Sequence, residues 1–83
     1  MQPIVLNIKY AGAEIDTQIF PEENLRGMLY PVEMNENYVF TIFQTEEDEW
    51  GIMREPNGNT PFIENELYET VIKKLRHELQ YAA

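Results

Sequence analysis

The chain contains no cysteine, no serine and only one histidine in 83 residues. Nucleophilic catalysts usually need a serine or cysteine that a positioned histidine activates, so these absences exclude most of them. Zinc sites built on cysteine are excluded as well. Any proton-transfer enzyme would depend on His77 or on a carboxylate with a shifted pKa, and we therefore do not expect an enzyme.

Positive charge is also scarce. Six Lys and Arg residues stand against fifteen Asp and Glu residues, which leaves a net charge of −9 at pH 7. Proteins that bind nucleic acids displace counterions with Lys and Arg, so direct binding to a phosphate backbone or to an anionic membrane is not expected. The N-terminal residues show neither a basic lead-in nor a long apolar run, and we expect a cytoplasmic protein.

The composition fits one globular domain over residues 1–83. Hydrophobic residues make up 43% of the chain and charged residues 25%, values that are ordinary for a folded domain. A chain of this length has no room for a second core, so nearly every large apolar side chain must contribute to the first.

The first segment predicts a β-hairpin. Apolar and polar residues alternate over 4–10 and again over 13–19, with Ala11 and Gly12 between the two runs. A two-residue loop there pairs Tyr10 with Ala13 and puts the isoleucines on one face. A slip by one residue would set those isoleucines against acids, so the sequence favours this register.

The next two segments are less regular. Residues 21–27 begin with Pro21, continue with two glutamates and end at Gly27, an order that predicts one or two helical turns. Residues 28–34 predict a short strand. Pro31 has no N–H to donate, so we expect this strand at an edge or at a bulge of the sheet.

A second hairpin follows, with a strand over 38–45, a tip over 46–48 and a return over 49–55. Both faces of the first of these strands are apolar. We expect Tyr38, Phe40 and Ile42 to face the helix because they carry the larger volume. Val39 and Phe43 then point away from it and form an apolar patch on the opposite face. The alternative is that the connector near Leu25 and Met28 folds over this face and covers the patch.

The C-terminal segment predicts an amphipathic helix over 61–81. Thr60 can cap it, Pro61 fits its first position, and the basic residues fall late, as the helix dipole favours. At 100° per residue, one apolar stripe gathers Leu67, Tyr68, Val71, Ile72, Leu75 and Leu79. We expect an α+β fold in which this helix packs on one face of a four- to five-stranded, mainly antiparallel meander of hairpins.

Four consecutive carboxylates stand at the tip of the second hairpin: Glu46, Glu47, Asp48 and Glu49. Neighbouring side chains on extended backbone point in alternate directions, and the glycine-containing spacing of an EF-hand is missing. A solvated turn is the favoured interpretation, a docking surface for a basic protein is the second, and a metal site is the third. We expect no metal and no cofactor. His77 falls on the polar face of the helix, where we expect a surface side chain.

The sequence favours a small acidic, non-enzymatic protein-interaction module that self-associates, with a homodimer as the expected form. The candidate partner-binding residues are Val39, Phe43, Glu46, Glu47, Asp48 and Glu49. One alternative is an acidic inhibitor that mimics a nucleic acid and occupies the basic site of a DNA- or RNA-binding protein. A second alternative is an enzyme that uses carboxylates with shifted pKa values.

Overall fold

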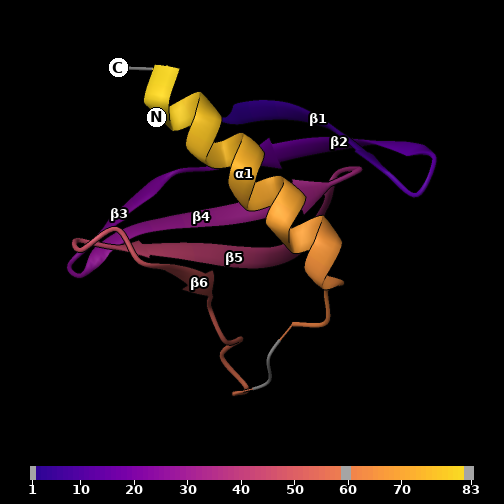
Figure 1. The fold of residues 1–83 in the computed structure, drawn as a ribbon. Coiled ribbons are helices and arrows are strands. Elements are labelled where there is room, and N and C mark those ends of the chain that lie inside the picture. Colours follow the sequence, from indigo (N-terminus) through magenta and orange to yellow (C-terminus); the bar gives the residue numbers. More distant parts are fainter. Residues whose placement is uncertain (1, 59–60, 82–83) are drawn as a thin grey trace.

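The computed structural model describes residues 2–58 and 61–81. Within them the chain forms β1 (Ile4–Tyr10), β2 (Ala13–Ile19), β3 (Glu22–Asn24), β4 (Gly27–Met34), β5 (Asn37–Thr45), β6 (Trp50–Ile52) and α1 (Asn65–Tyr81). The strands form one antiparallel sheet in the order β1-β2-β4-β5-β6, and β3 pairs with the part of β4 that β2 leaves free. The helix α1 crosses one face of this sheet (Figure 1). The expected α+β fold is confirmed, with six strands in the described residues instead of four or five.

The first hairpin has the predicted register. Tyr10 pairs with Ala13, Ile8 with Ile15, and Ile4 with Ile19. Ala11 and Gly12 both have positive φ, at 51° and 81°, which is the backbone of the type I′ turn that suits a two-residue hairpin loop.

The segment that we predicted as helical turns is strand β3, so that prediction was wrong. β3 pairs with β4 across a tight turn, in which the backbone N–H of Arg26 donates to the side-chain oxygen of Asn24 at 3.1 Å. A helix of this length would make few internal hydrogen bonds, whereas β3 gains a ladder with β4. Gly27 has φ 141° at the end of the turn, a conformation that favours glycine.

Strand β4 lies inside the sheet, contrary to the edge position that Pro31 suggested. The carbonyl of Pro31 accepts a hydrogen bond from the N–H of Phe20 at 3.0 Å. The N and O of one strand residue point to the same side, so the missing N–H of Pro31 also faces this side. Here β2 ends and β3 begins, and the pairing of β4 with β5 needs no donor from Pro31.

Strand β5 contains a bulge that moves Tyr38 to the unexpected face. Val32 pairs with Phe40 but Glu33 pairs with Tyr38, so Val39 is an extra residue in β5. Phe40 and Ile42 are fully buried under α1, as predicted, but Tyr38 is 51% exposed and its hydroxyl lies 2.9 Å from the Thr41 hydroxyl on the other face. Our assignment of Tyr38 to the helix-facing side was therefore wrong.

The helix begins at Asn65, four residues later than predicted. Its first turn is closed by the N–H of Tyr68, which donates to the carbonyl of Glu64 at 2.9 Å. Thr60, the expected cap, lies outside the described residues. The last turn of α1 carries no basic residue, because Arg76 and His77 lie just before it.

The core lies between α1 and the inner face of the sheet. Val71 and Leu75 of the helix are fully buried, and the other four residues of the predicted stripe pack against the same cluster. The sheet contributes Leu6, Ile8, Ile19, Tyr30, Val32, Met34, Phe40 and Ile42. At the far end of the first hairpin, the hydroxyl of Tyr10 donates to the carboxylate of Glu64, which raises the pKa of Tyr10 to about 12.

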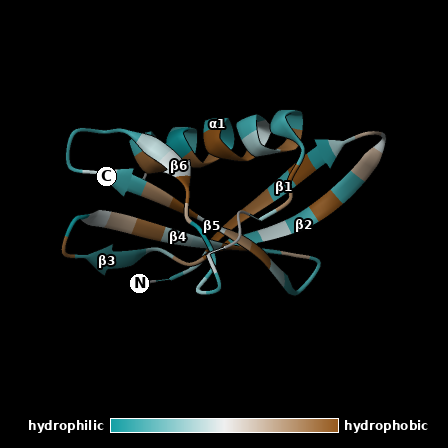
Figure 2. Cartoon of the chain, turned by 90° about the horizontal axis from the view of Figure 1, so that it is seen from below, coloured by the Kyte–Doolittle hydropathy of each residue, from teal (hydrophilic) through white to brown (hydrophobic). Residues whose placement is uncertain are grey.

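In the described part of the chain, α1 is the only helix, and it lies on one side of the sheet (Figure 2). The other side, which we call the outer face, carries the side chains that alternate with those of the core. The molecule measures 37 × 35 × 20 Å, and its smallest dimension fits one helix layer on one sheet layer. In the described residues no helix therefore covers the outer face, although Thr41 on this face is buried.

Candidate interaction surface

Phe43 lies in an apolar hollow on the outer face. Its neighbours across the ladder are Leu29 of β4 and Gly51 of β6. The ring rests against the backbone of β6, because a Cβ atom built on Gly51 would lie only 2.7 Å from Cζ of Phe43. Met53, which is 42% exposed, and Arg26 also line this hollow of about 300 Å³.

Val39 does not share this hollow. It is the extra residue of the β5 bulge, is half-buried, and packs against the core cluster. The apolar patch of Val39 and Phe43 that the sequence suggested is therefore not formed. Leu29 and Met53 surround Phe43 instead, and strict alternation along β5 cannot reveal them because they come from β4 and from the segment after β6.

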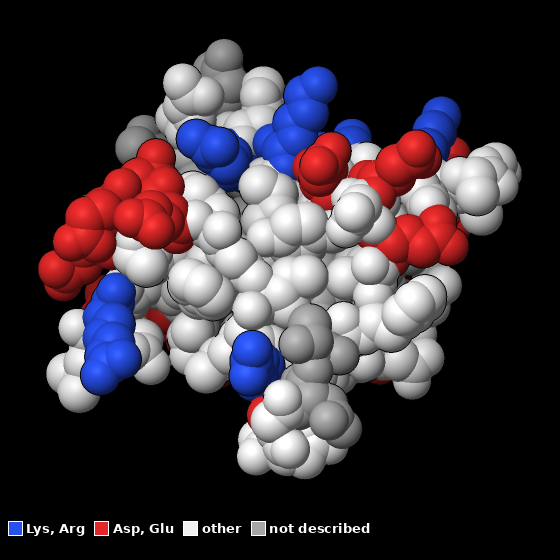
Figure 3. Space-filling view, turned by 60° about the horizontal axis from the view of Figure 1, so that its bottom comes forward, with Lys and Arg blue, Asp and Glu red and all other residues white. Residues whose placement is uncertain are grey.

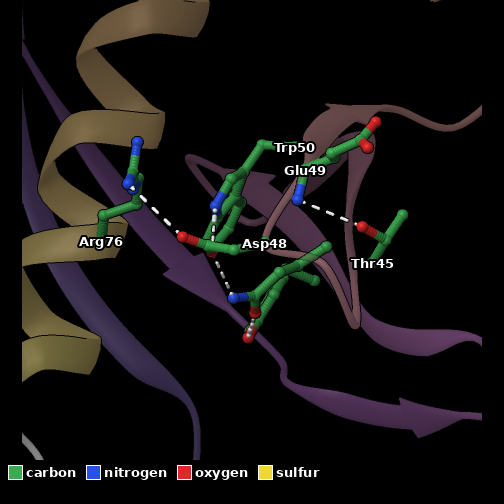
Figure 4. A network of polar contacts seen from close by, with 7 residues as sticks. Thr45, Asp48, Glu49, Trp50 and Arg76 are labelled. Carbon is green, nitrogen blue, oxygen red and sulfur yellow. Dashed lines mark hydrogen bonds and ion pairs between the residues drawn. The ribbon is translucent and has the colours of Figure 1, made fainter.

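The acidic tip divides into two parts. Glu46, Glu47 and Glu49 are exposed, and their side chains form no ion pair within residues 2–58 and 61–81. Asp48 turns toward the helix. Its Oδ1 accepts hydrogen bonds from Nε2 of Gln44 at 3.0 Å and from Nε1 of Trp50 at 2.9 Å, and its Oδ2 lies 3.8 Å from the guanidinium of Arg76 (Figure 4).

These contacts favour the charged form of Asp48. The hydrogen bond from Gln44 makes the largest contribution, followed by that from Trp50 and by the charge of Arg76, and together they lower the pKa of Asp48 below its ordinary value. Asp48 also has φ 64°, which lets the tip reverse direction over a few residues. Asp48 therefore connects the hairpin tip to α1, while its side chain remains 60% exposed.

Two aromatic contacts complete this network. Trp50 stacks on Tyr30 with ring centroids 5.6 Å apart and an interplanar angle of 17°, and the guanidinium of Arg76 lies 5.7 Å from the centroid of Trp50. The hydroxyl of Tyr30 donates to Oε1 of Gln44 at 2.8 Å. Residue patterns do not predict the contact of Arg76 with Asp48 and Trp50, because Arg76 lies far along the chain from both.

The helix borders two grooves. One, of about 560 Å³, lies between α1 and Trp50 and includes Lys73 and Arg76. The other, of about 640 Å³, lies between α1 and β1. His77 lines both and is exposed, as predicted. None of the carboxylates in the described residues is buried.

On the face that Figure 3 presents, the acids do not form one continuous strip. Figure 3 shows them in separate groups on the face it presents, with Lys and Arg side chains between them and a broad uncharged area in the middle. A mimic of nucleic acid needs regularly spaced negative charge, and this view does not favour that alternative.

Two further findings limit the kinds of site. Within the described residues, no group of three or more His, Asp or Glu side chains is arranged to hold a metal ion. No helix in the same part of the chain is long and apolar enough to cross a membrane. Comparisons with protein-family models, with curated proteins and with solved structures find no match to this chain.

Proposed function

We propose that this protein is a small non-enzymatic interaction module that self-associates through the outer face of its sheet. The observation that carries the proposal is the apolar hollow around Phe43 on the face opposite α1. Apolar side chains grouped on an uncovered sheet face lose their contact with water when another surface covers them. The hollow is the centre of the proposed interface.

The dimensions suit a second copy of the chain as the partner. A stable interface buries roughly 800 Å² on each partner, the area of a square with sides of about 28 Å. The two larger dimensions of the molecule, 37 and 35 Å, both exceed that length. A two-fold contact also uses the same patch on both copies, so one apolar hollow is sufficient.

Acidic side chains lie at both ends of β4. Glu22 of β3 pairs with Leu29, and Glu46 follows Thr45, which pairs with Gly27 at the same end. Glu33 lies near the other end, where β4 pairs with β2. A two-fold axis through the hollow therefore brings like charges of the two copies near each other, and the apolar contact has to outweigh their repulsion.

Sedimentation velocity at tens of micromolar tests the proposal, with Phe43→Glu as the test variant and Phe62→Glu as its matched control. Both variants replace phenylalanine with glutamate and so change the charge equally. Phe62 is a suitable control because it is 93% exposed and does not line the hollow. We expect the unmodified chain and Phe62→Glu to sediment at about twice 9.8 kDa. Each Phe43 substitution acts twice in a two-fold interface, so the dissociation constant should rise at least about 100-fold.

A folded Phe43→Glu variant is needed for this comparison, and its thermal transition by circular dichroism provides the check. A 9.8 kDa species for the unmodified chain at these concentrations would contradict self-association. Dimers that persist in Phe43→Glu would show that another surface forms the contact.

A further inference from the structure

The free edge of β1 is the longest regular sheet edge in the described residues. β1 has seven residues without a bulge or an internal proline, whereas β6 at the opposite edge has three. Unpaired N–H and C=O groups on such an edge can pair with a further strand. Edges of this kind are used by domains that bind an extended peptide by strand addition.

The hydrogen bonds of β2 show which backbone groups of β1 are free to pair. The N–H of Asn35 donates to the carbonyl of Asp16, and the N–H of Phe20 donates to the carbonyl of Pro31, so the even-numbered residues of β2 face β4. The odd-numbered ones therefore face β1, where they pair with the even-numbered residues of β1. The N–H and C=O groups of Val5, Asn7 and Lys9 consequently point away from the sheet.

A groove runs beside this edge. Val5, Leu6 and Asn7 form one wall, and one flank of α1 forms the other. The helix contributes Thr70, Lys73, Lys74, His77 and Glu78. A strand added to β1 would direct alternate side chains along this flank, because side chains on a strand alternate between the two faces.

The charge of the groove differs from that of the chain. Lys73 and Lys74 line it together and make no ion pair with another described residue, although the whole chain carries −9. Glu78 is the one carboxylate among its lining residues. The groove therefore favours carboxylates on an incoming strand and disfavours basic side chains.

From these observations we propose that β1 binds an extended acidic peptide of a partner protein as an added strand, with Lys73 and Lys74 binding its carboxylates. The backbone edge supplies the affinity for an extended chain, and the two lysines supply the preference for acidic residues. This site is separate from the hollow around Phe43, so it does not depend on self-association.

The probe is a fluorescein-labelled hexapeptide of alternating Glu and Val, compared with the same peptide built from Lys and Val. The alternating pattern lets every glutamate face α1 when the peptide pairs with β1. Fluorescence anisotropy measures affinity at low salt, and amide chemical shifts of Val5, Asn7 and Lys9 report the edge. We expect the Glu peptide to bind at least about 10-fold more tightly and to shift these amides.

Two sets of variants test separately how the backbone edge of β1 and the charge of the groove contribute to peptide binding. Asn7→Pro removes an outward-pointing N–H while the pairing of β1 with β2 stays intact, and Asn7→Ala is its control. Lys74→Glu reverses one positive charge of the groove, and Arg54→Glu makes the same charge change elsewhere. We expect each test variant to weaken binding at least about fivefold and each control to leave it within about twofold.

Equal binding of the Glu and Lys peptides would overturn the proposal, and so would full affinity in a folded Asn7→Pro variant. A single-stranded oligonucleotide of equal charge serves as the other test of specificity. If the oligonucleotide binds as tightly as the Glu peptide and Asn7→Pro does not weaken its binding, the groove is a general anion site. The proposal of an added strand is then wrong. Phe43→Glu should bind the Glu peptide normally, which keeps this test apart from that of self-association.

Discussion

At the scale of single residues, Gly27 is the position where the backbone leaves least room. A Cβ atom there would lie 2.0 Å from the carbonyl oxygen of Gln44, and φ is 141°. Gly12 also has a positive φ, 81°, but a Cβ atom there meets nothing within 4 Å. A comparison of alanine substitutions at the two glycines therefore separates the energetic cost of a steric clash from the cost of the positive φ angle alone.

We expect Gly12→Ala to lower the free energy of unfolding by about 1 kcal/mol, because alanine resists positive φ. Gly27→Ala should cost more than about 3 kcal/mol, since the turn between β3 and β4 must move away from β5 as well. Urea denaturation followed by Trp50 fluorescence measures both. Equal costs for the two variants would show that the close approach of Gly27 to Gln44 is absent in solution.

Asp48 provides a prediction about pH. Its folded pKa is lower than its unfolded value near 3.8, so its contribution to stability is present above that value. The contribution is lost as the pH falls through the lower, folded pKa. Trp50 is the only tryptophan and donates to Asp48, so its fluorescence should change with a midpoint below 3.8.

Asp48→Asn is the control, because it keeps a side-chain oxygen for Trp50 but cannot titrate. We expect the fluorescence step below pH 3.8 to disappear in this variant. A step that persists would mean that Trp50 senses other carboxylates or global unfolding, and the role of Asp48 at the tip would then be wrong.

Residue patterns predicted the first hairpin but failed for Tyr38. On the helix-facing side of β1 and β2 every apolar residue has an apolar or small partner, and a shift would oppose isoleucine to acid, so the pattern allows one register. In β5 both faces are apolar, and no residue marks the extra position at Val39. The bulge there follows from the pairing with β4, which alternation along a single strand does not contain.

At the scale of elements, α1 supplies the cover for the inner face. Leu75 is fully buried and Leu25 is fully exposed in the turn after β3, so the same substitution at both positions compares the two environments. We expect Leu75→Ala to lower the free energy of unfolding by about 2 to 5 kcal/mol and Leu25→Ala to change it by less than about 0.5 kcal/mol. Urea denaturation measures both.

A chain that ends before Thr60 tests the same point for the whole element. Without α1 the core loses two fully buried residues and the four that pack beside them. Burial of each large apolar side chain is worth about 1.5 to 3 kcal/mol, and a domain has only about 5 to 15 kcal/mol in total. A sharp thermal transition in this fragment would contradict the two-layer architecture.

The elements that the sequence misplaced are those whose state depends on a neighbour. The helix carried its own signal, a stripe at a period of 3.6 residues, and only its first turn was placed too early. The three residues of β3 are too few to show a periodic pattern, and β3 forms because its backbone pairs with that of β4. Pro31 is tolerated inside the sheet because its side of β4 lies at the junction between β2 and β3, which no local pattern reveals.

At the scale of the whole molecule, the sequence indicated an uncovered sheet face and an acidic hairpin tip. It did not indicate which residues from other elements contact Phe43 on that face and Asp48 at that tip. Phe43 was expected on the outer face and lies there, while the hollow around it needs Leu29 from β4 and Met53 from the segment after β6. The tip was expected to carry four free carboxylates. Asp48 is drawn into contact with Arg76 and Trp50, and only the folded arrangement brings α1 close enough for that contact.

The net charge of −9 gives the two proposed surfaces opposite responses to salt. Two copies of an acidic chain repel each other, and this repulsion reaches about 30 Å at 10 mM salt but only about 3 Å at 1 M. We therefore expect self-association through the Phe43 hollow to strengthen as salt rises, because burial of apolar area is not screened. An acidic peptide bound to Lys73 and Lys74 should instead weaken over the same range.

Sedimentation equilibrium and peptide anisotropy, carried out on the same salt series, measure the two responses. The double variant Glu46→Gln and Glu47→Gln lowers the charge from −9 to −7 and should reduce the salt dependence of self-association without changing the fold. If dimers dissociate as salt rises, ion pairs and not the apolar hollow hold them together. The interface would then have to be sought among the charged side chains at the edges of the sheet, and Phe43 would be an ordinary half-buried aromatic residue.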